Sequence, residues 1–331
     1  MPGSWPVRIV VLLALVLAAT VGVLWLVPSD HYIVLPDRAR PTDPLVKVPG
    51  EDQRPSEEGI YMVDVRVGRA SLFERLFPSI HEGSTLVPEE VLNPEGVSDR
   101  QRRTSSLNAM SHSQQIAVAV ALRELGREVD VTPLGAEVVL VQPGFPADGE
   151  LEIGDVIVEA DGEPIRSITA LQRAMADVRP GERVTLVVRR GERRVELRLE
   201  TRASQREADR AVVGVQVEDA EEFDFPLPVR IDAGSIGGPS AGLAFALDIV
   251  DELGRDLDEG RRVVVTGELT LEGRVIAIGG IRQKAIGAKE ADADLFLVPD
   301  ANAAEARRYA GDLEVVAVSN FDEALSALAR G

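Results

Sequence analysis

The chain has 331 residues, enough for two or three domains that each bury a core, and its apolar (45%) and charged (27%) fractions argue against wholesale disorder. Its 36 basic and 55 acidic residues give a net charge of −19, which argues against broad nucleic-acid binding, because no run of Lys or Arg could neutralise many phosphates. Cysteine is absent, which excludes a thiol nucleophile, disulfides and thiolate metal sites.

The N-terminus predicts a membrane-spanning helix. Residues 9–27, "IVVLLALVLAATVGVLWLV", are 19 residues without a charge, about the length that spans hydrocarbon. Trp5 and Trp25 flank or close this run and would lie roughly 30 Å apart on a helix, one at each interface. Because the run continues past the small residues "LAAT", we predict that residues 1–28 form an uncleaved anchor. A cleaved signal peptide is the alternative. The flanking arginines leave the orientation open.

Residues 29–130 show no recognisable chemistry. Residues 36–59 are rich in proline and charge and predict an extended connection. Residues 60–68, "IYMVDVRVG", alternate as a strand does, and residues 71–77 and 113–125 predict helices. We interpret this region as a linker and accessory segment. The alternative is that strand 60–68 pairs with the sheet of the C-terminal domain, which would make the intervening domain an insertion.

Residues 131–203 predict a β-rich domain with one helix. The strands are "AEVVLV", "DVIVEADGEPI", "RVTLVV" and "RRVELRLE", and the helix is "SITALQRAMADV". This order resembles a PDZ domain of the kind attached to bacterial proteases, most specifically in "GDVIVEADGEPI". A PDZ domain binds an extended peptide as an added strand beside a helix, with backbone amides near the first strand receiving a carboxylate.

The resemblance places the peptide-binding loop at Leu134, Gly135 and Ala136, directly after Pro133. This loop departs from the usual Gly-Leu-Gly-Phe form, so the class of ligand stays open. We favour peptide binding, and the alternative is a PDZ fold that serves only as a spacer.

Residues 210–330 predict a mixed α and β domain. "VVGVQV", "PVRI", "DLFLVP" and "EVVAV" predict strands, "IRQKAIGAKEA" and "SNFDEALSALAR" helices, and "RRVVVTGELTLEGRVIAI" a hairpin that turns at Glu272-Gly273. "NAAEARRYAG" predicts a helix with Asn302 and Glu305 as a capping box. The late alternation of strands and helices predicts a parallel pairing with helical crossovers.

A candidate nucleophile lies in "GSIGGPSAGLAFALDIVDELG", residues 234–254. Pro239 suits the first helical position, which makes Gly238 the N-cap and places Ser240 in the first turn. The unpaired amides there and the positive end of the helix dipole can hold a phosphate or an oxyanion.

A serine nucleophile needs a base, and histidine is absent from this domain: His31, His81 and His112 are the only three in the chain. Lys284 in "GGIRQKAIG" can serve if it is neutral. Burial and a positive helix end both lower a lysine pKa, and a change from about 10.4 to about 7 needs about 4–5 kcal/mol of environmental bias. The alternative is a solvated surface lysine.

"GGPSAGLAFAL" followed by "VVVTGELTLEGRVIAIGGIRQKAIGAKEADADLFLVP" is similar to the proteolytic domain of Lon-type peptidases, which use a Ser-Lys dyad. The resemblance implies Ser240 as the nucleophile, Lys284 as the general base and Thr266 as a hydroxyl that helps to orient the lysine. It implies an oxyanion site at the backbone of Gly238 and Ser240. Gly237 departs from the Asp that ATP-dependent members carry there, which leaves the resting conformation of the loop open.

The expected fold is therefore α+β: an N-terminal transmembrane helix, a PDZ domain and a Lon-type proteolytic domain of the ribosomal S5 domain 2-like fold. This order resembles the membrane-anchored, PDZ-containing Lon-like serine peptidases of bacteria. That resemblance implies a single-pass protein of the cell membrane whose catalytic domain is extracytoplasmic. It implies peptide or unfolded-protein substrates, no nucleic-acid partner, no metal and no cofactor, and it is compatible with a homo-oligomeric ring.

No G-x-x-x-x-G-K-[ST] pattern occurs in the sequence, so we expect cleavage without ATP. Two other interpretations stay open. One is a PDZ adaptor with an inactive peptidase fold. The other, which we favour less, is a nucleotide-binding enzyme related to galactokinase and mevalonate kinase, whose "GLGSSAG"-like loop resembles "IGGPSAG" but lacks the proline.

Overall fold

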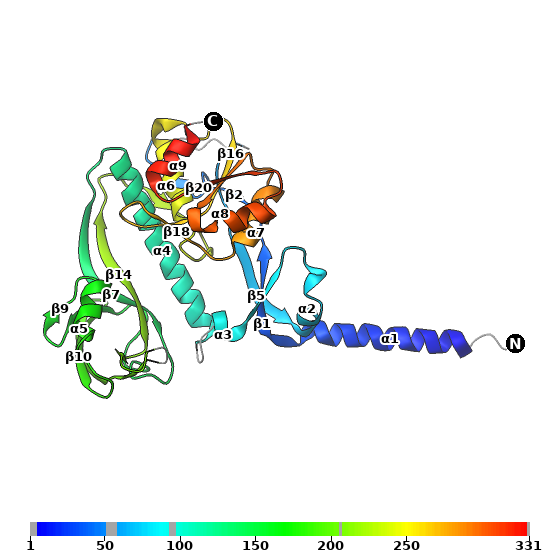
Figure 1. Ribbon diagram of the computed structural model, residues 1–331, viewed down its shortest axis with the longest axis horizontal. Helices are drawn as coiled ribbons and strands as arrows, with labels where there is room; N and C mark the ends of the chain where they lie inside the picture. The colour runs from blue at the N-terminus through cyan, green and yellow to red at the C-terminus, as the bar shows by residue number, and fades with distance from the viewer. Residues whose placement is uncertain (1–4, 51–57, 93–96, 205–206, 330–331) are drawn as a thin grey trace.

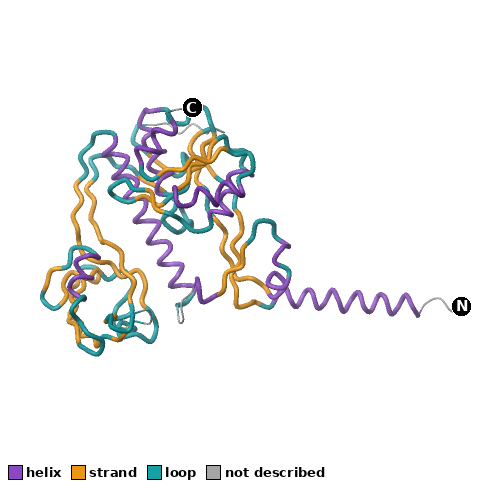
Figure 2. The backbone as a smooth tube through the Cα atoms, in the orientation of Figure 1, coloured by secondary structure: helices purple, strands orange, loops and turns teal. Residues whose placement is uncertain are grey.

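A computed structural model of the chain describes residues 5–50, 58–92, 97–204 and 207–329 (Figure 1). Helix α1 projects from the rest of the molecule, and a small sheet lies at its end. Beyond that sheet are a mixed unit of helices and strands that holds the C-terminus and a β-rich unit that a long two-stranded ribbon joins to it. Helices surround the strands of the mixed unit, whereas strands and loops dominate the β-rich unit (Figure 2).

Helix α1 (Trp5–Leu26) lies within the predicted anchor. Its segment Val7–Leu26 is long and apolar enough to cross a membrane, and none of it is buried against the protein. The Thr20 hydroxyl donates to the Val16 carbonyl at 2.9 Å, which satisfies this polar side chain within the helix. A signal sequence shares these properties of length and composition.

A three-stranded antiparallel sheet follows α1, with β1 between β5 and β6. Its strands are β1 (Pro28–Pro36), β5 (Val65–Ser71) and β6 (Thr85–Pro88). Three short helices connect to these strands: α2 (Leu72–Leu76), the 3-10 helix η1 (Pro78–Ile80) and α3 (Glu89–Leu92). Ser71 and Glu74 form a capping box that starts α2, which explains the helix predicted over 71–77.

The single strand predicted over 60–68 is wrong, because two strands in different sheets share this segment. The chain leaves β4 (Gly59–Met62) and enters β5 after Val63 and Asp64. β4 pairs in parallel with β16 (Arg262–Val265) of the mixed unit, whereas β5 pairs with β1. The alternating pattern is the same on both sides of the bend, so periodicity cannot reveal where the chain changes sheets.

The five-stranded sheet of the mixed unit has the order β2-β4-β16-β19-β20, parallel apart from β2. Its remaining strands are β2 (Arg40–Pro41), β19 (Leu295–Pro299) and β20 (Glu314–Val318). Helices α7 (Ile281–Glu290) and α8 (Asp300–Tyr309) form the crossovers, and α9 (Phe321–Leu328) follows β20. The predicted parallel pairing with helical crossovers is confirmed. β4 and β2 also place part of the segment before the β-rich unit in this sheet.

Three local predictions in this region need correction. The hairpin is confined to β17 (Glu268–Leu269) and β18 (Val275–Ile276), because β16 pairs with β4 and β19 instead. Asn302 does not cap α8, whose N-cap is Pro299. The Asn302 side chain instead accepts from the Ile278 amide at 2.8 Å and donates to the Ile278 carbonyl at 3.1 Å. The predicted extended connection contains β2 and β3 (Val46–Lys47), which pairs with β15 (Arg230–Ile231), and its residues 51–57 lie outside the described part of the chain.

Two helices form the centre of the mixed unit. Every residue of α6 (Gly242–Val250) is buried, and the π-helical turn η2 (Asp251–Arg255) follows it. Helix α4 (Asp99–Glu124) packs along α6 and starts fourteen residues before the predicted helix 113–125. Its first half, "DRQRRTSSLNAMSH", is polar, so it shows no apolar period, and a capping box at Ser98 and Gln101 starts it. Gly126, with φ +73°, follows its end.

The β-rich unit has its own core beneath an antiparallel sheet of the order β11-β10-β8-β7-β14, with β9 on β8. Its elements are β7 (Asp130–Val141), β8 (Val156–Ala160), β9 (Glu163–Pro164), α5 (Ile168–Met175), β10 (Arg183–Arg190), β11 (Arg193–Glu200), β12 (Arg202–Ala203), β13 (Ala211–Val212) and β14 (Val215–Asp224). β14 pairs with β7 along its whole length, so this sheet continues past residue 203, where we expected the domain to end. The two strands form the ribbon of Figure 1.

Candidate active site and peptide groove

Ser240 lies in a turn just before α6, not in its first turn as we expected. Helix α6 begins at Gly242, and Ala241 is its N-cap with φ −97°. The Ser240 carbonyl accepts from the Gly267 amide at 2.9 Å and from the Thr266 hydroxyl at 3.3 Å. The Ser240 carbonyl is thus bonded to the β16–β17 connection and not within a helix. This tertiary contact accounts for the later start of α6.

Helix α4 holds the loop that carries Ser240. The Gly238 amide donates to the Ser106 carbonyl at 2.7 Å, and the Ser113 hydroxyl donates to the Pro239 carbonyl at 2.9 Å. A Cβ on Gly237 would lie 2.4 Å from the Ser106 hydroxyl oxygen and 3.2 Å from the Ser106 carbonyl oxygen, so a side chain there would displace Ser106. Gly237, the position at which the resemblance expects an aspartate in ATP-dependent members, therefore packs closely against α4.

The oxyanion donors expected from the sequence are only partly free. Gly238 is not, because its amide is bonded to Ser106. In the described part of the chain, the amides of Ser240 and Ala241 have no hydrogen-bond acceptor. These two amides are therefore the better candidates to stabilise a negative oxygen beside the Ser240 hydroxyl.

Lys284 reaches Ser240 from α7. Its Nζ donates to Ser240 Oγ at 2.6 Å and to Thr266 Oγ1 at 3.0 Å. Thr266 is fully buried, and its amide donates to the Leu297 carbonyl of β19 at 3.0 Å. The three polar side chains expected from the sequence therefore meet, although they come from the loop before α6, the end of β16 and the first turns of α7.

The environment of Lys284 favours its neutral form. The side chain is 2% exposed, and burial lowers its pKa from 10.5 to about 8. The carboxylate of Asp64 opposes this change and raises the pKa. An amine that loses its proton near pH 8 and contacts a hydroxyl has the geometry and the basicity of a general base.

Asp64 belongs to a charged cluster at the edge of the site. Arg40 Nη2 lies 2.9 Å from Asp37 Oδ2 and 3.5 Å from Asp64 Oδ2. Burial raises the pKa of the Asp64 carboxyl, while the charge of Arg40 lowers it.

The cluster opens into a cleft of about 530 Å³. Its lining comes from the strands before β6, from α4 and from the Ser240 and Lys284 segments: Asp37, Arg40, Asp64, Val65, Arg66, Val67, Arg102, Arg103, Ser106, Ser235, Ile236, Gly237, Pro239, Ser240, Glu268, Ala277, Ile278, Gly279 and Lys284. Ser240 and Lys284 thus both line this cleft.

We expect Asp64→Asn to shift the rising limb of the pH–activity profile to lower pH. Removing the carboxylate removes an interaction that favours the charged lysine, so Lys284 loses its proton more readily. The measurement is kcat/KM for a peptide between pH 6 and pH 10. Asp37→Asn is the matched control, because Asp37 lines the same cleft but is not among the groups that shift the pKa of Lys284. The expectation would be contradicted if the rising limb of Asp64→Asn moved to higher pH, or if it moved no further than that of Asp37→Asn.

The residues that the sequence predicts to bind peptide lie inside the sheet of the β-rich unit. Leu134, Gly135 and Ala136 lie inside β7, where Gly135 and Ala136 pair with β14 and Ala136 also pairs with β8. A Cβ on Gly135 would lie 2.3 Å from the Ile157 carbonyl oxygen, so glycine at this position allows β7 and β8 to approach closely. The edge of Gly135 and Ala136 that faces β14 is therefore occupied, and Ala136 is paired on both sides.

A candidate peptide groove lies between α5 and β14. β14 is the last strand of the sheet, so one of its edges is paired with β7, and no strand in the described residues covers the other. A cavity of about 1400 Å³ separates this edge from α5, and Ile168, Leu171 and Met175 line it from the helix. Residues 204 and 207–217 line the opposite wall.

Gly214 shapes the start of this groove. Its φ is +85°, and a Cβ there would lie 2.1 Å from the Cβ of Phe145. The segment "AVVGVQV" therefore places a glycine that packs against Phe145 directly before the edge strand β14. We expected this segment to be a strand of the C-terminal domain, whereas β14 belongs to the sheet of the β-rich unit.

Comparison with known proteins assigns both units. Residues 204–330 match the family model of the Lon protease (S16) C-terminal proteolytic domain, and residues 115–201 match that of the PDZ domain. A Lon protease of Rickettsia bellii is 34% identical over 118 residues, covering 34% of this chain and 15% of that protein. A Lon protease of Roseiflexus castenholzii is 34% identical over 103 residues, covering 29% of this chain and 13% of that protein.

Among solved structures, the PDZ domain of an SdrC-like protein from Listeria monocytogenes is 22% identical, with a TM-score of 0.25, and covers 27% of this chain and 92% of that one. The chain spans 13–15% of the length of the curated relatives it matches.

The chain therefore joins a PDZ domain to a Lon-type proteolytic domain. With the apolar helix α1 ahead of them, this is consistent with a membrane-anchored, PDZ-containing Lon-like peptidase.

Proposed function

We propose that this chain is a membrane-anchored serine endopeptidase that cleaves flexible peptides or unfolded proteins without ATP. The contact that carries the proposal is the 2.6 Å approach of a buried lysine amine, with a pKa of about 8, to the hydroxyl of Ser240. The matches to Lon-type proteolytic domains support the same chemistry.

In the proposed reaction Lys284 acts first as base and then as acid in both acylation and deacylation. Its neutral Nζ takes the proton of Ser240 Oγ, and the oxygen attacks the carbonyl carbon of the substrate peptide bond. The amides of Ser240 and Ala241 stabilise the negative carbonyl oxygen. Lys284 then gives its proton to the departing amine, which leaves an acyl ester on Ser240. Lys284 next takes a proton from water, which attacks the ester carbonyl. Lys284 returns this proton to Ser240 Oγ as the acyl–oxygen bond breaks, which releases the acid product and restores the hydroxyl. Thr266 holds the amine in place throughout.

Casein hydrolysis by the full chain in detergent tests this proposal. We expect cleavage without ATP, no stimulation by ATP, and loss of cleavage in both Ser240→Ala and Lys284→Ala. Inactivity of the parent toward casein and short peptides alike would favour a PDZ adaptor with an inactive peptidase fold. Equal activity in all three proteins would place the nucleophile elsewhere.

The pH dependence follows from the pKa of Lys284. The base is active when neutral, so kcat/KM for a peptide should rise with pH through about 8 and level off above it. Because the group is a lysine with a lowered pKa, activity is lost on the acid side. A flat profile from pH 6 to pH 9 would count against a lysine base.

We further propose that the PDZ groove presents the substrate, with an extended segment added to the free edge of β14 beside α5. The open edge and the apolar residues of α5 that face it support this assignment. The resemblance noted for the sequence favours an extracytoplasmic position of both domains.

Met175→Glu should raise KM for a protein substrate about 10-fold and leave the hydrolysis of a short peptide unchanged. It places a charge in the apolar groove, at a cost of about 1–3 kcal/mol to the bound state. Arg173→Glu is the control, because Arg173 is exposed on the same helix and does not line the cavity. The groove is not used for presentation if both variants match the parent.

A further inference from the structure

An exposed apolar face lies where α1 meets the folded domains. Outside α1 and the adjoining Val27, six large apolar side chains in the described residues are more than a third exposed, and three of them fall within five residues of one another. The six are Val67, Leu76, Phe77, Ile80, Val91 and Ile276. Leu76, Phe77 and Ile80 are 61%, 54% and 46% exposed, and we refer to these three as the α2 face.

The α2 face continues the surface of α1. The ring of Trp25, near the end of α1, stacks on Phe73 of α2 at a centroid distance of 5.2 Å. Phe73 in turn lies 4.8 Å from Phe77, so aromatic rings run unbroken from the helix to the face. The Leu72 amide also donates to the Val27 carbonyl at 2.9 Å, which fixes α2 beside the end of α1.

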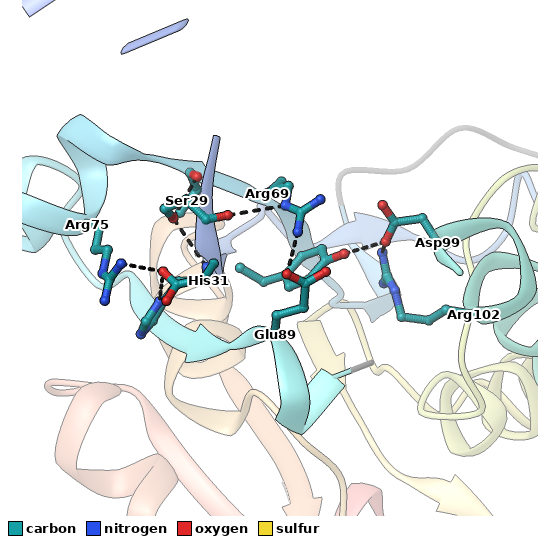
Figure 3. Close-up of polar contacts among 10 residues, drawn as sticks. Ser29, His31, Arg69, Arg75, Glu89, Asp99 and Arg102 are labelled. Carbon is teal, nitrogen blue, oxygen red and sulfur yellow. Dashed lines mark hydrogen bonds and ion pairs between the residues drawn. The ribbon is translucent and has the colours of Figure 1, made fainter. Parts of the chain in front are cut away.

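Polar contacts also hold the segment from Ser71 to His81 in place. Glu74 accepts from the Ser71 amide at 2.7 Å and lies 3.0 Å from His81 Nε2, which joins the two ends of the segment. Arg75 contacts Asp30 at 2.5 Å, and Asp30 also contacts His31 (Figure 3). The segment that carries the α2 face is thus held in place by hydrogen bonds and ion pairs while the face itself is exposed.

The same close-up shows how β1 is tied to the helices beyond it. Arg69 of β5 pairs with Glu89 of α3, and Asp99 at the start of α4 lies between the Tyr32 hydroxyl and Arg102 (Figure 3). Because α4 also holds the Ser240 loop, a chain of packed elements connects the α2 face to the candidate active site. The position of one fixes the position of the other.

We propose that the α2 face inserts into the interface of the lipid bilayer that α1 crosses. The inference rests on the membrane anchor of the proposed function. Lipid is the occupant because the face begins at the lipid-exposed end of α1 and is continuous with it through Trp25 and Phe73. Aromatic and aliphatic side chains with an arginine nearby are the composition that lies at the headgroup boundary. With α1 as the first attachment to the bilayer, the α2 face provides a second one. This second attachment prevents the domains from rotating about the end of α1 and holds the catalytic cleft at one orientation above the membrane.

The absence of cysteine makes single-cysteine labelling a direct test. Phe77→Cys and Ile80→Cys, each in the full chain and each carrying a nitroxide, would be reconstituted into phospholipid vesicles. Power-saturation spectroscopy would compare access of oxygen, which concentrates in lipid, with access of a water-soluble nickel chelate. Leu15→Cys in the middle of α1 is the lipid control. Val91→Cys on α3, also apolar and 66% exposed, is the water control, and Figure 1 places α3 on the other side of the small sheet from α1. Peptide hydrolysis by each labelled protein confirms folding.

We expect the oxygen-to-nickel access ratio at positions 77 and 80 to be several-fold higher than at 91 and to approach that at 15. Ratios equal to that at 91, with a high ratio at 15, would overturn the proposal and leave the anchor intact. Shielding of 77 and 80 from both reagents would also overturn it, because protein, such as a second copy of the chain, would then cover the face. A water-like ratio at 15 would refute the anchor itself and the α2 proposal with it.

Discussion

Replacing Lys284 with methionine should lower kcat/KM for peptide hydrolysis by about 10²- to 10⁴-fold, the usual contribution of a general base. Methionine fills a similar volume in the buried site but cannot take the proton of Ser240. Lys289→Met is the matched control, because Lys289 is exposed near the end of the same helix and should keep full activity. Initial rates on a quenched fluorescent peptide at pH 9 measure the effect.

Two further variants separate a base from a structural lysine. Lys284→Arg should not restore activity, because a guanidinium stays charged at this pH. The double variant Ser240→Ala, Lys284→Met should be no slower than either single variant, because the two residues act as a unit. Activity within threefold of the parent in Lys284→Met would show that another group activates Ser240.

Phe245→Ala should lower the free energy of unfolding by about 3–5 kcal/mol, the usual cost of a buried phenylalanine. Phe245 is fully buried at the centre of α6, the helix that starts just after Ser240. Urea unfolding of the full chain in detergent, followed by circular dichroism, measures the effect. Val91→Ala should change the stability by no more than about 0.5 kcal/mol, because that side chain is 66% exposed. Similar midpoints for the two variants would contradict the packing described for α6.

The order of elements in the C-terminal domain was predictable, because its apolar runs are long and glycines separate them. The spatial meeting of Ser240, Thr266 and Lys284 was expected from resemblance alone, since their spacing in sequence does not specify contact. The start of α6 was not predictable. Local signals placed it at Pro239, but the Ser240 carbonyl is bonded to Gly267, and only the folded sheet reveals that contact.

The PDZ domain shows how domain boundaries mislead. Its free edge strand, β14, comes from residues after 210, beyond the segment whose pattern resembled a PDZ domain. We therefore assigned the peptide loop to residues 134–136, although the free edge of the sheet lies at β14, directly after Gly214. The first half of α4 was missed for a different reason. Its polar face contacts the backbone of the Ser240 loop through the Ser106 carbonyl and the Arg103 side chain, and such polar contacts leave no apolar period in the sequence.

The most direct test of the central claim is the pH dependence of covalent labelling of the full chain by a fluorophosphonate. A nucleophile activated by the neutral amine of Lys284 should be modified at Ser240, as located by mass spectrometry. The rate should rise through an apparent pKa near 8 and fall at least 100-fold in Lys284→Met, the lower end of a general base's contribution. Labelling at another serine, or a rate at Ser240 that is flat from pH 6 to pH 9 and unchanged in Lys284→Met, would contradict the dyad.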